Sequence, residues 1–268
     1  MQTLIALKAA FLFFKNKYTQ IGMLEISIGA EKLFEIAGFP VTNTLLTTWF
    51  MVGFFIVATQ VWLKKVRLVP ALSQNVFEAV IEGVLGMMDS VLGERQKSEK
   101  YFPLIATIFI FVISSNWFGI FPGFGSIGFN EIHEGHEVFV PIFRSGAADL
   151  NFTLALAVIS VISVQFFGIA AIGFFKHAKK YFTFKNPIET FVGALEFISE
   201  IAKMISFSFR LFGNVFAGEV LLIITGFLVP YFVPVPFLFL ELFVGFIQAL
   251  VFAMLTLVFL GMATSEHH

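Results

Sequence analysis

The feature that most constrains this chain is a series of long segments that are almost free of charge. Residues 45–63, 104–121 and 152–175 contain no Asp, Glu, Lys or Arg, and residues 237–263 contain only Glu241. A helix of about 20 apolar residues crosses the ~30 Å hydrocarbon core of a bilayer. Only 13% of the residues are charged, against roughly a quarter in a soluble domain. The chain is therefore predicted to be an all-α integral membrane protein.

A fifth apolar stretch, residues 188–229, is twice as long as a bilayer requires and carries charge. It contains no proline, and as one helix it would be about 63 Å long at ~1.5 Å per residue. Either it forms one strongly tilted helix, which gives five membrane helices, or it breaks into a hairpin. Its charged residues are Glu189, Glu196, Glu200, Lys203, Arg210 and Glu219.

Basic residues outside these stretches predict the orientation, because cytoplasmic loops carry an excess of Lys and Arg. Residues 64–100 contain six basic residues and residues 176–185 contain four, whereas residues 131–149 contain only Arg144. This pattern places the N-terminal segment, residues 1–43, outside and the C-terminus in the cytoplasm. Three lysines near the N-terminus run against this orientation.

Residues 73–92 have the pattern of an amphipathic helix. Apolar residues recur there at helical spacing, and the opposite side carries Gln74, Glu78, Glu82 and Asp89. Such a helix is expected to lie on the cytoplasmic surface of the membrane. Since the chain contains no short repeat or low-complexity linker, it is interpreted as a single membrane domain, residues 1–268.

Polar residues of the long stretch fall on one narrow stripe if the stretch is helical. At ~100° per residue, six of them lie within about 80° of one another. They are Glu196, Ser199, Lys203, Ser206, Arg210 and Asn214. Glu219 falls nearly opposite Arg210, and in the last apolar stretch Glu241 and Gln248 share a face because they are seven residues apart.

A charged stripe at membrane depth must face protein or a water-filled cavity. An Arg, Lys or Asp at the centre of a membrane helix costs about 2.5–3.5 kcal/mol on insertion scales. The stripe either forms an ion path or holds helices together by polar contacts. Its six members, with a further carboxylate opposite, favour the ion path. Gly213 and Gly218 would let a neighbouring helix approach closely.

The residue types in the stripe predict different roles in such a path. Arg210 cannot release its proton at physiological pH, so it is predicted to act as a fixed positive charge. The candidate proton relays are the carboxylates Glu196, Glu200, Glu219 and Glu241. The candidates that orient water are Ser199, Ser206, Asn214 and Gln248.

The segment Ser206-Phe-Ser-Phe-Arg210-Leu-Phe-Gly-Asn214-Val closely resembles the signature of subunit a of F-type ATP synthases. That signature consists of a small residue, any residue, a second small residue and an apolar residue, followed by Arg-Leu-x-small-Asn-apolar. Three other segments are similar to the end of the second span, the start of the third span and the C-terminal helix of the family. They begin at Asn116, Ala148 and Gln248, and Ala217-Gly218-Glu219 matches as well.

The resemblance implies a stator subunit beside a rotating ring of c subunits. Ions would pass through two aqueous half-channels, offset across the membrane, that meet carboxylates of the ring. The essential arginine of the family corresponds to Arg210, and residues 188–229 would form one tilted helix that makes a long hairpin with the last span. The outer half-channel corresponds to Asn214, Glu219, Glu241 and Gln248. The inner half-channel corresponds to Glu196, Ser199, Glu200, Lys203 and Ser206.

The resemblance also implies the partners and the location of the chain. The partners would be the c ring, the b subunits of the peripheral stalk, the rest of the ATP synthase and the lipid bilayer, in a bacterial plasma membrane. The chain would perform no bond chemistry itself, and it contains no phosphate-binding loop of the form G-x-x-x-x-G-K-[ST]. No cofactor, metal or nucleic acid is expected, and the net charge of −1 offers no attraction for a polyanion.

One pair of positions departs from the family pattern. Many bacterial members pair a glutamate with a histidine across the last two helices, where this chain has Glu219 and Glu241. Two carboxylates in one pocket titrate as a coupled pair. They are expected to share a proton or to hold water, so that either one alone can be replaced with partial activity.

Two other classes of protein were weighed against this interpretation. A secondary transporter would show inverted repeats and broken helices around a midplane site, and neither is found. An intramembrane enzyme would need a nucleophile–base pair or metal ligands, yet the predicted spans contain no histidine and the chain no cysteine. His133 and His136 beside Glu134 have ligand-like spacing, but we interpret them as polar surface of the outer loop.

Overall fold

The structure, a computed structural model, describes residues 29–36, 38–64, 72–121, 127–133, 136–181, 186–229 and 232–265. Of residues 130–133 and 136–139 it describes the backbone alone. The predictions for most of the N-terminal segment and for the three C-terminal residues lie outside the described residues.

Five helices in the described residues are long and apolar enough to cross a membrane, as predicted. They are α2 (Asn43–Leu63), α4 (Arg95–Phe118), α5 (Leu150–Ile172), α7 (Pro187–Leu228) and α8 (Pro234–Thr264). The amphipathic stretch forms α3 (Leu72–Leu92). Its helical periodicity separates a buried side, which includes Leu85 and Met88, from an exposed one.

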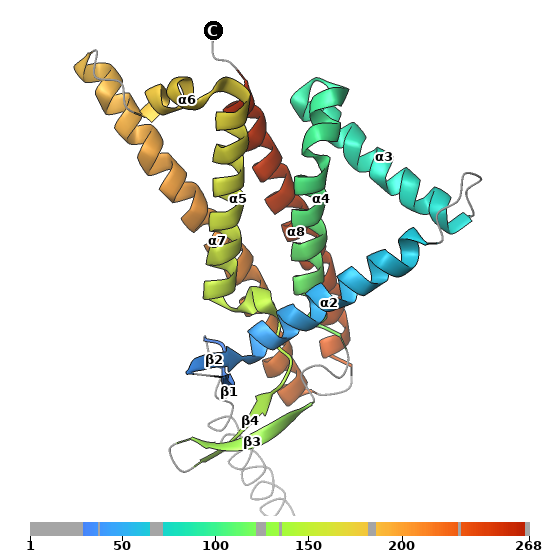
Figure 1. Cartoon of the computed structure of the whole chain (residues 1–268). Coiled ribbons are helices and arrows are strands. Elements are labelled where there is room, and N and C mark those ends of the chain that lie inside the picture. The colour runs from blue at the N-terminus through green and yellow to red at the C-terminus, as the bar shows by residue number, and fades with distance from the viewer. Residues whose placement is uncertain are drawn as a thin grey trace, which may run out of the picture.

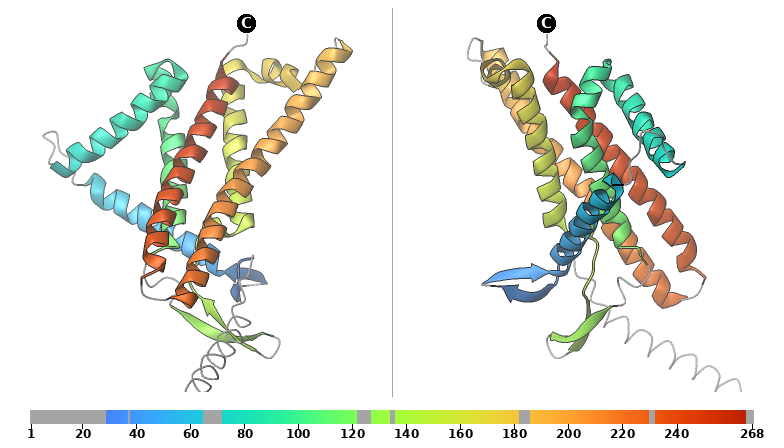
Figure 2. Two further views of the ribbon diagram at one scale, coloured as in Figure 1. Left: turned by 180° about the vertical axis from the view of Figure 1, so that it is seen from behind. Right: turned by 45° about the vertical axis from the view of Figure 1, so that its right-hand side comes forward.

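Four of the helices form a bundle from which the other long helices lean away. α8 packs against α4, α5 and α7, and α5 packs against α7. α2 and α3 diverge from the bundle and leave much apolar surface exposed (Figures 1 and 2). Two clusters of buried apolar side chains fill the bundle, one around Leu211 and Phe252 and the other around Ile105 and Leu257.

The long charged stretch is one continuous helix of 42 residues, α7. At ~1.5 Å per residue it is about 63 Å long. It is inclined relative to α5 and follows the side of the bundle to the end that carries the strands (Figures 1 and 2). The alternative that this stretch folds into a hairpin is therefore wrong.

Two helix boundaries differ from the predicted ones for identifiable reasons. α4 begins at Arg95, nine residues before the predicted span. The prediction counted only the apolar segment, whereas the helix also includes the polar residues before it. α5 ends at Ile172, because Gly173 adopts a φ of +86° that reverses the chain. The next residues start a short helix that the sequence analysis missed, α6 (Phe174–Tyr181).

Two small hairpins of β-strands add to the helical fold at one end of the bundle (Figure 1). β1 (Lys32–Ile36) pairs antiparallel with β2 (Phe39–Thr42), and β3 (Gly128–His133) pairs antiparallel with β4 (His136–Pro141). A single-turn 3₁₀ helix, η2 (Gly146–Ala148), leads from β4 toward α5. Sequence analysis did not predict the strands, because it treated these segments as loops between apolar stretches.

Polar contacts across helices fix the packing of the bundle. The Asn116 side chain on α4 donates to the carbonyl of Gly245 on α8 at 2.9 Å, and Trp117 donates to the carbonyl of Leu242 at 3.0 Å. Buried hydroxyl pairs join α5 to its neighbours, Thr153 to Ser208 at 3.1 Å and Ser160 to Thr256 at 2.9 Å. The segment beginning at Asn116 therefore has a structural role, because it clamps α4 onto the last helix.

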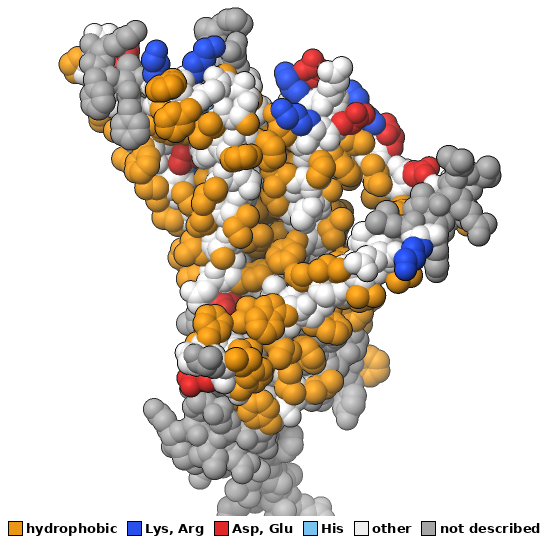
Figure 3. Space-filling model, in the orientation of Figure 1, with side chains coloured by type: hydrophobic (Ala, Val, Ile, Leu, Met, Phe, Trp, Pro, Cys, Tyr) orange, Lys and Arg blue, Asp and Glu red, His pale blue; other side chains and the backbone are white. Residues whose placement is uncertain are grey.

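Charged side chains are distributed unevenly along the bundle. Lys and Arg gather at the end that carries α6 and the turn between α3 and α4, and apolar side chains cover the region between the two ends (Figure 3). The described basic residues of α6 and of the turn between α3 and α4 thus share one end of the molecule, whereas Lys64 follows α2, whose last turn lies away from that end (Figure 1).

Candidate ion path

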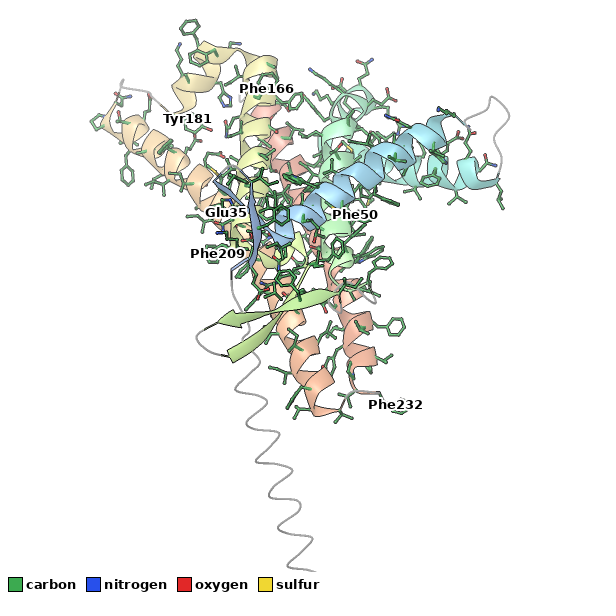
Figure 4. All side chains as sticks on the ribbon, turned by 60° about the horizontal axis from the view of Figure 1, so that its bottom comes forward. Glu35, Phe50, Phe166, Tyr181, Phe209 and Phe232 are labelled. Carbon is green, nitrogen blue, oxygen red and sulfur yellow. The ribbon has the colours of Figure 1, made fainter. Side chains whose placement is uncertain are left out.

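The signature segment on α7 divides its side chains between two faces of the helix. Phe207, Ser208 and Leu211 are buried against the bundle. Ser206 and Arg210 are exposed on the outward face, and Figure 4 marks the neighbouring Phe209. This division follows from helical geometry, because positions three and four apart lie on the same side.

Arg210 is a cation without a carboxylate partner among the described residues. Among the described residues its guanidinium donates a hydrogen bond only to the hydroxyl of Ser206, at 3.4 Å. Gln248 of α8 lines the same small recess as Arg210, with Phe207 and Leu211. The structure therefore brings Gln248 beside Arg210, while the charged end of Arg210 remains available to a partner outside the chain.

We call the four residues predicted for the outer half-channel the outer group: Asn214, Glu219, Glu241 and Gln248. Asn214 and Glu219 follow Arg210 on α7, which runs toward the end that carries the strands (Figure 1). Glu241 and Gln248 lie on α8, and Gln248 lines the same recess as Arg210. Glu219 and Glu241 are close enough to interact electrostatically. Asn214 is partly buried one turn beyond Arg210.

Glu219 has an ion-pair partner that sequence analysis missed. Arg144, in the segment between β4 and η2, contacts Glu219 with its Nε 3.0 Å from Oε1. The Arg144 side chain is only 7% exposed, and it also donates to the carbonyl of Gly29 at 2.9 Å. Sequence analysis had assigned Arg144 to an outer loop. The available signal for a paired role was that Arg144 is the only basic residue in an acidic segment.

Glu241 packs directly against α7 where that helix has a glycine. A Cβ atom placed on Gly218 would lie 2.8 Å from Oε1 of Glu241, so any larger residue at this position would displace the carboxylate. The Oε2 atom of Glu241 is buried and has no hydrogen-bond partner among the described residues. Gly213 has no atom of the described chain within 4 Å of such a Cβ, so within this chain it supports no close approach.

We call the five residues predicted for the inner half-channel the inner group: Glu196, Ser199, Glu200, Lys203 and Ser206. Lys203 forms an ion pair with Glu200 at 2.7 Å, and its ammonium lies 4.4 Å from the ring centre of Phe259. Ser199 and Ser206 are exposed and Glu196 is partly buried. The pairing makes the two charges tolerable at depth, since each compensates the other.

The described residues contain no cluster of three or more His, Cys, Asp or Glu that could hold a metal ion. The side chains of His133 and His136 lie outside the described part, although their backbones face each other in the β3–β4 hairpin.

Residues 42–261 match the family described as ATP synthase A chain. The chain belongs to this family. The match covers α2, α4, α5, α7 and nearly all of α8, including the segments that carry Arg210, Glu219 and Glu241.

Curated relatives named ATP synthase subunit a match this chain along nearly their whole length. ATP synthase subunit a of Helicobacter pylori (strain Shi470) is 37% identical over 252 residues, which cover 89% of this chain and 99% of that protein. The chloroplastic ATP synthase subunit a of Stigeoclonium helveticum is 36% identical over 247 residues, which cover 91% of this chain and 94% of that protein. Subunit a of Helicobacter acinonychis (strain Sheeba) is 36% identical over 252 residues, with 89% and 99% covered.

These similarities confirm the resemblance that the sequence motifs carried. The chain is a multi-pass, non-catalytic subunit of the ATP synthase membrane sector with the role of a stator subunit, and its partners are the other subunits of that complex. The two alternative interpretations, a secondary transporter and an intramembrane enzyme, are set aside because the chain belongs to this family.

Proposed function

We propose that subunit a passes protons to and from carboxylates of a c ring through two half-channels separated by Arg210. The observation that carries this proposal is the position of Arg210. Its cation is exposed on the outward face of α7, has no carboxylate partner in the described chain, and lies between the outer and inner groups. A fixed positive charge at that place attracts an ionised ring carboxylate and repels a proton that would pass directly between the groups.

The surface around Arg210 supports a rotating partner on this face. The exposed side chains that share its face of α7 are mostly small near the middle of the helix and apolar toward its ends. Small residues permit a close approach of neighbouring helices in membranes. The small residues are Ser199, Ser206, Gly213 and Ala217, and the apolar ones are Val192, Leu221 and Leu228.

The remaining parts of the proposal concern the other partners and the membrane. We place the b subunits of a peripheral stalk beside α2 and α3, whose apolar surface is exposed in the isolated chain. The proposed location is a bacterial plasma membrane with the N-terminus outside and the C-terminus in the cytoplasm. The gathering of basic residues at the end with α6 supports this orientation.

Substitution of Arg210 tests the proposal in the assembled ATP synthase. In inverted membrane vesicles, Arg210→Ala should lower ATP-driven proton pumping to below about 1% of the wild-type rate, as for loss of a key electrostatic group. Lys97→Ala, which removes a basic residue paired with Glu94 at the start of α4, should leave pumping near wild type. Pumping by the Arg210→Ala enzyme at the rate of this control would overturn the proposal.

Crosslinking tests the position of the ring, because the chain has no cysteine of its own. A cysteine introduced at Gly213, on the face of Arg210, should form a disulfide with cysteines placed in the membrane helices of subunit c. A cysteine at Gly226, about 140° from Gly213 and about 160° from Arg210 around α7 by helix geometry, is the matched control and should not. Crosslinking from the cysteine at position 226 but not from the one at position 213 would contradict the proposed position of the ring on the Arg210 face of α7.

A further inference from the structure

The β1–β2 hairpin, which lies outside the ion path, has one apolar face. The two strands pair so that Phe34 lies opposite Val41 and Ile36 lies opposite Phe39. Residues directly opposite each other in an antiparallel pair, and residues two apart on one strand, project to the same side of a sheet. These four apolar side chains therefore share one face. Glu35, between Phe34 and Ile36 on β1, belongs to the other face.

Within the described chain, this apolar face is covered only where the hairpin joins the rest of the molecule. Val41, two residues before α2, is 1% exposed, whereas Phe34, Ile36 and Phe39 are 44%, 55% and 60% exposed. Single apolar side chains are common on protein surfaces, but a contiguous group of large ones marks an interaction surface. A two-stranded hairpin is also marginally stable in water unless one face packs against something. The distal part of the face therefore needs a partner.

The opposite side of the hairpin is suited to water. Glu35 forms an ion pair with Lys32, three residues earlier on β1, and both side chains are about half exposed. Figure 4 marks Glu35 on the hairpin. An exposed pair of this kind contributes little to stability. It does indicate which side faces water, because charged side chains are costly to place in hydrocarbon.

The position of the hairpin indicates lipid as the partner of the apolar face. β2 ends at Thr42, and α2, one of the five helices able to cross a membrane, begins at Asn43. A four-residue strand is about 13 Å long at ~3.3 Å per residue, so all of β2 lies within that distance of the start of α2. The hairpin extends sideways from the bundle rather than along its long axis (Figures 1 and 2). Its apolar face therefore lies near the level at which α2 enters the membrane, where lipid surrounds the protein.

We propose that the β1–β2 hairpin is a membrane-interface anchor whose apolar face rests in the lipid leaflet at this end of the bundle. Amphipathic segments bury their apolar face about 5–10 Å into the boundary between headgroups and acyl chains. Phe34, Ile36 and Phe39 occupy this boundary, while Lys32 and Glu35 stay among headgroups and water. Because β2 continues directly into α2, the anchor fixes the point at which that helix enters the membrane. The inference goes beyond the proposed function and depends on neither the ion path nor the c ring.

Spin labels on the two faces of the hairpin test the anchor in assembled ATP synthase in liposomes. The chain has no cysteine, so Phe39→Cys in a complex otherwise free of cysteine places one label on the apolar face. Glu35→Cys, on the other face of the same hairpin, is the matched control. Oxygen concentrates among lipid acyl chains, whereas a nickel chelate stays in water. The label at position 39 should collide several-fold more often with oxygen than with the chelate, and the label at position 35 should show the reverse.

A second position keeps the test decisive if Phe39→Cys does not assemble. Ile36→Cys places a label on the same apolar face and should report the same contact with lipid. A label at either position that collides mainly with the nickel chelate would show that the face lies in water, which would overturn the inference. A label shielded from both reagents would show that protein covers the face, and lipid would then be the wrong partner.

Discussion

The two acidic residues of the outer group are not equivalent, because within the described part of the chain only Glu219 has a buried cation beside it. Arg144 contacts both oxygens of Glu219, at 3.0 and 3.3 Å from Nε. Removing one partner of a buried ion pair leaves the other uncompensated, which costs about 3–5 kcal/mol when both are fully buried. The cost here should be smaller, since the Glu219 side chain is 29% exposed.

A double-mutant cycle tests whether Arg144 positions Glu219. Glu219→Gln and Arg144→Gln alone should each lower the amount of assembled subunit a, and the double variant should recover most of it. Glu241→Gln should assemble normally and lose only part of the proton flux, as expected for a carboxylate that shares its task with Glu219. The measurements are the amount of assembled complex and the pumping rate per complex. Additive losses in the double variant would contradict the pairing.

Gly218 provides a test of how closely Glu241 must approach α7. In Gly218→Ala the added Cβ would lie 2.8 Å from Oε1 of Glu241, so the carboxylate must move. We expect a several-fold loss of pumping, since displacement of a reacting group by ~1 Å can cost up to 100-fold in a rate. Gly226→Ala, where no described atom lies within 4 Å of the added carbon, should be neutral or stabilising. Equal pumping by the two variants would show that the position of Glu241 is not critical.

At the scale of elements, a network around Arg95 holds α3 against α4. Arg95 at the start of α4 forms ion pairs with Asp89 at 3.0 Å and Glu82 at 2.7 Å on α3, and with Glu99 on its own helix. Gly93, with a φ of +74°, forms the turn between the helices. The network is largely at the surface, and its effect is to fix the angle of α3 rather than to stabilise the whole bundle.

The pH dependence of this clamp follows from Asp89. Hydrogen bonding from Ser98, and then from Arg95, holds the pKa of Asp89 below its ordinary value of 3.8. Because the folded-state pKa is lowered, the contribution of Asp89 is fully present above pH ~4 and is lost as the pH falls through the lowered value. Hydrogen exchange of α3 should therefore accelerate on acidification below pH ~4 in the wild type, and should already be fast at neutral pH in Asp89→Asn. Glu78→Gln replaces a carboxylate that accepts a hydrogen bond from Gln74 within α3, and this control should behave as the wild type. If exchange in the control were as fast as in Asp89→Asn, Asp89 would have no special role in holding α3 against α4.

The long helices could be predicted from the sequence because each is encoded by one continuous apolar segment. Each of the five apolar segments predicted one of the five long helices. The absence of proline from residues 188–229 is compatible with the single helix α7. Helix α6 was missed because its eight residues are too few and too basic to stand out from a loop. The end of α5 was placed three residues late, since nothing in the local pattern distinguishes Gly173 from the other glycines before the reversal at its positive φ is seen.

The candidate site was predictable only where it is local. Arg210, Ser206 and Asn214 follow from spacing along one helix and from a recognisable segment. The Arg144–Glu219 pair joins residues 75 positions apart, and no periodicity relates a residue before η2 to one on α7. Long-range contacts of this kind require the packed structure.

At the scale of the whole molecule, the isolated chain leaves its mechanism incomplete. The bundle buries one side of α7 against α5 and α8, whereas the face of Arg210 is open. Under the proposed function, a proton that reaches Arg210 from the outer group meets a positive charge, and a carboxylate of the c ring takes it up and delivers it to the inner group from the other side. The open face of α7 is where the proposal requires this partner.

Reconstitution tests this dependence directly. Purified subunit a in liposomes should conduct protons no faster than empty liposomes, and the c ring alone should do the same. Liposomes that contain both should conduct, because the ring then supplies the carboxylates that carry protons past Arg210. The measurement is the decay of an imposed pH gradient, with the assembly of the two components checked by co-purification. Fast proton flux or substrate uptake through subunit a alone would mean that the polar residues of α7 and α8 form a continuous pathway, and that Arg210 does not separate two half-channels.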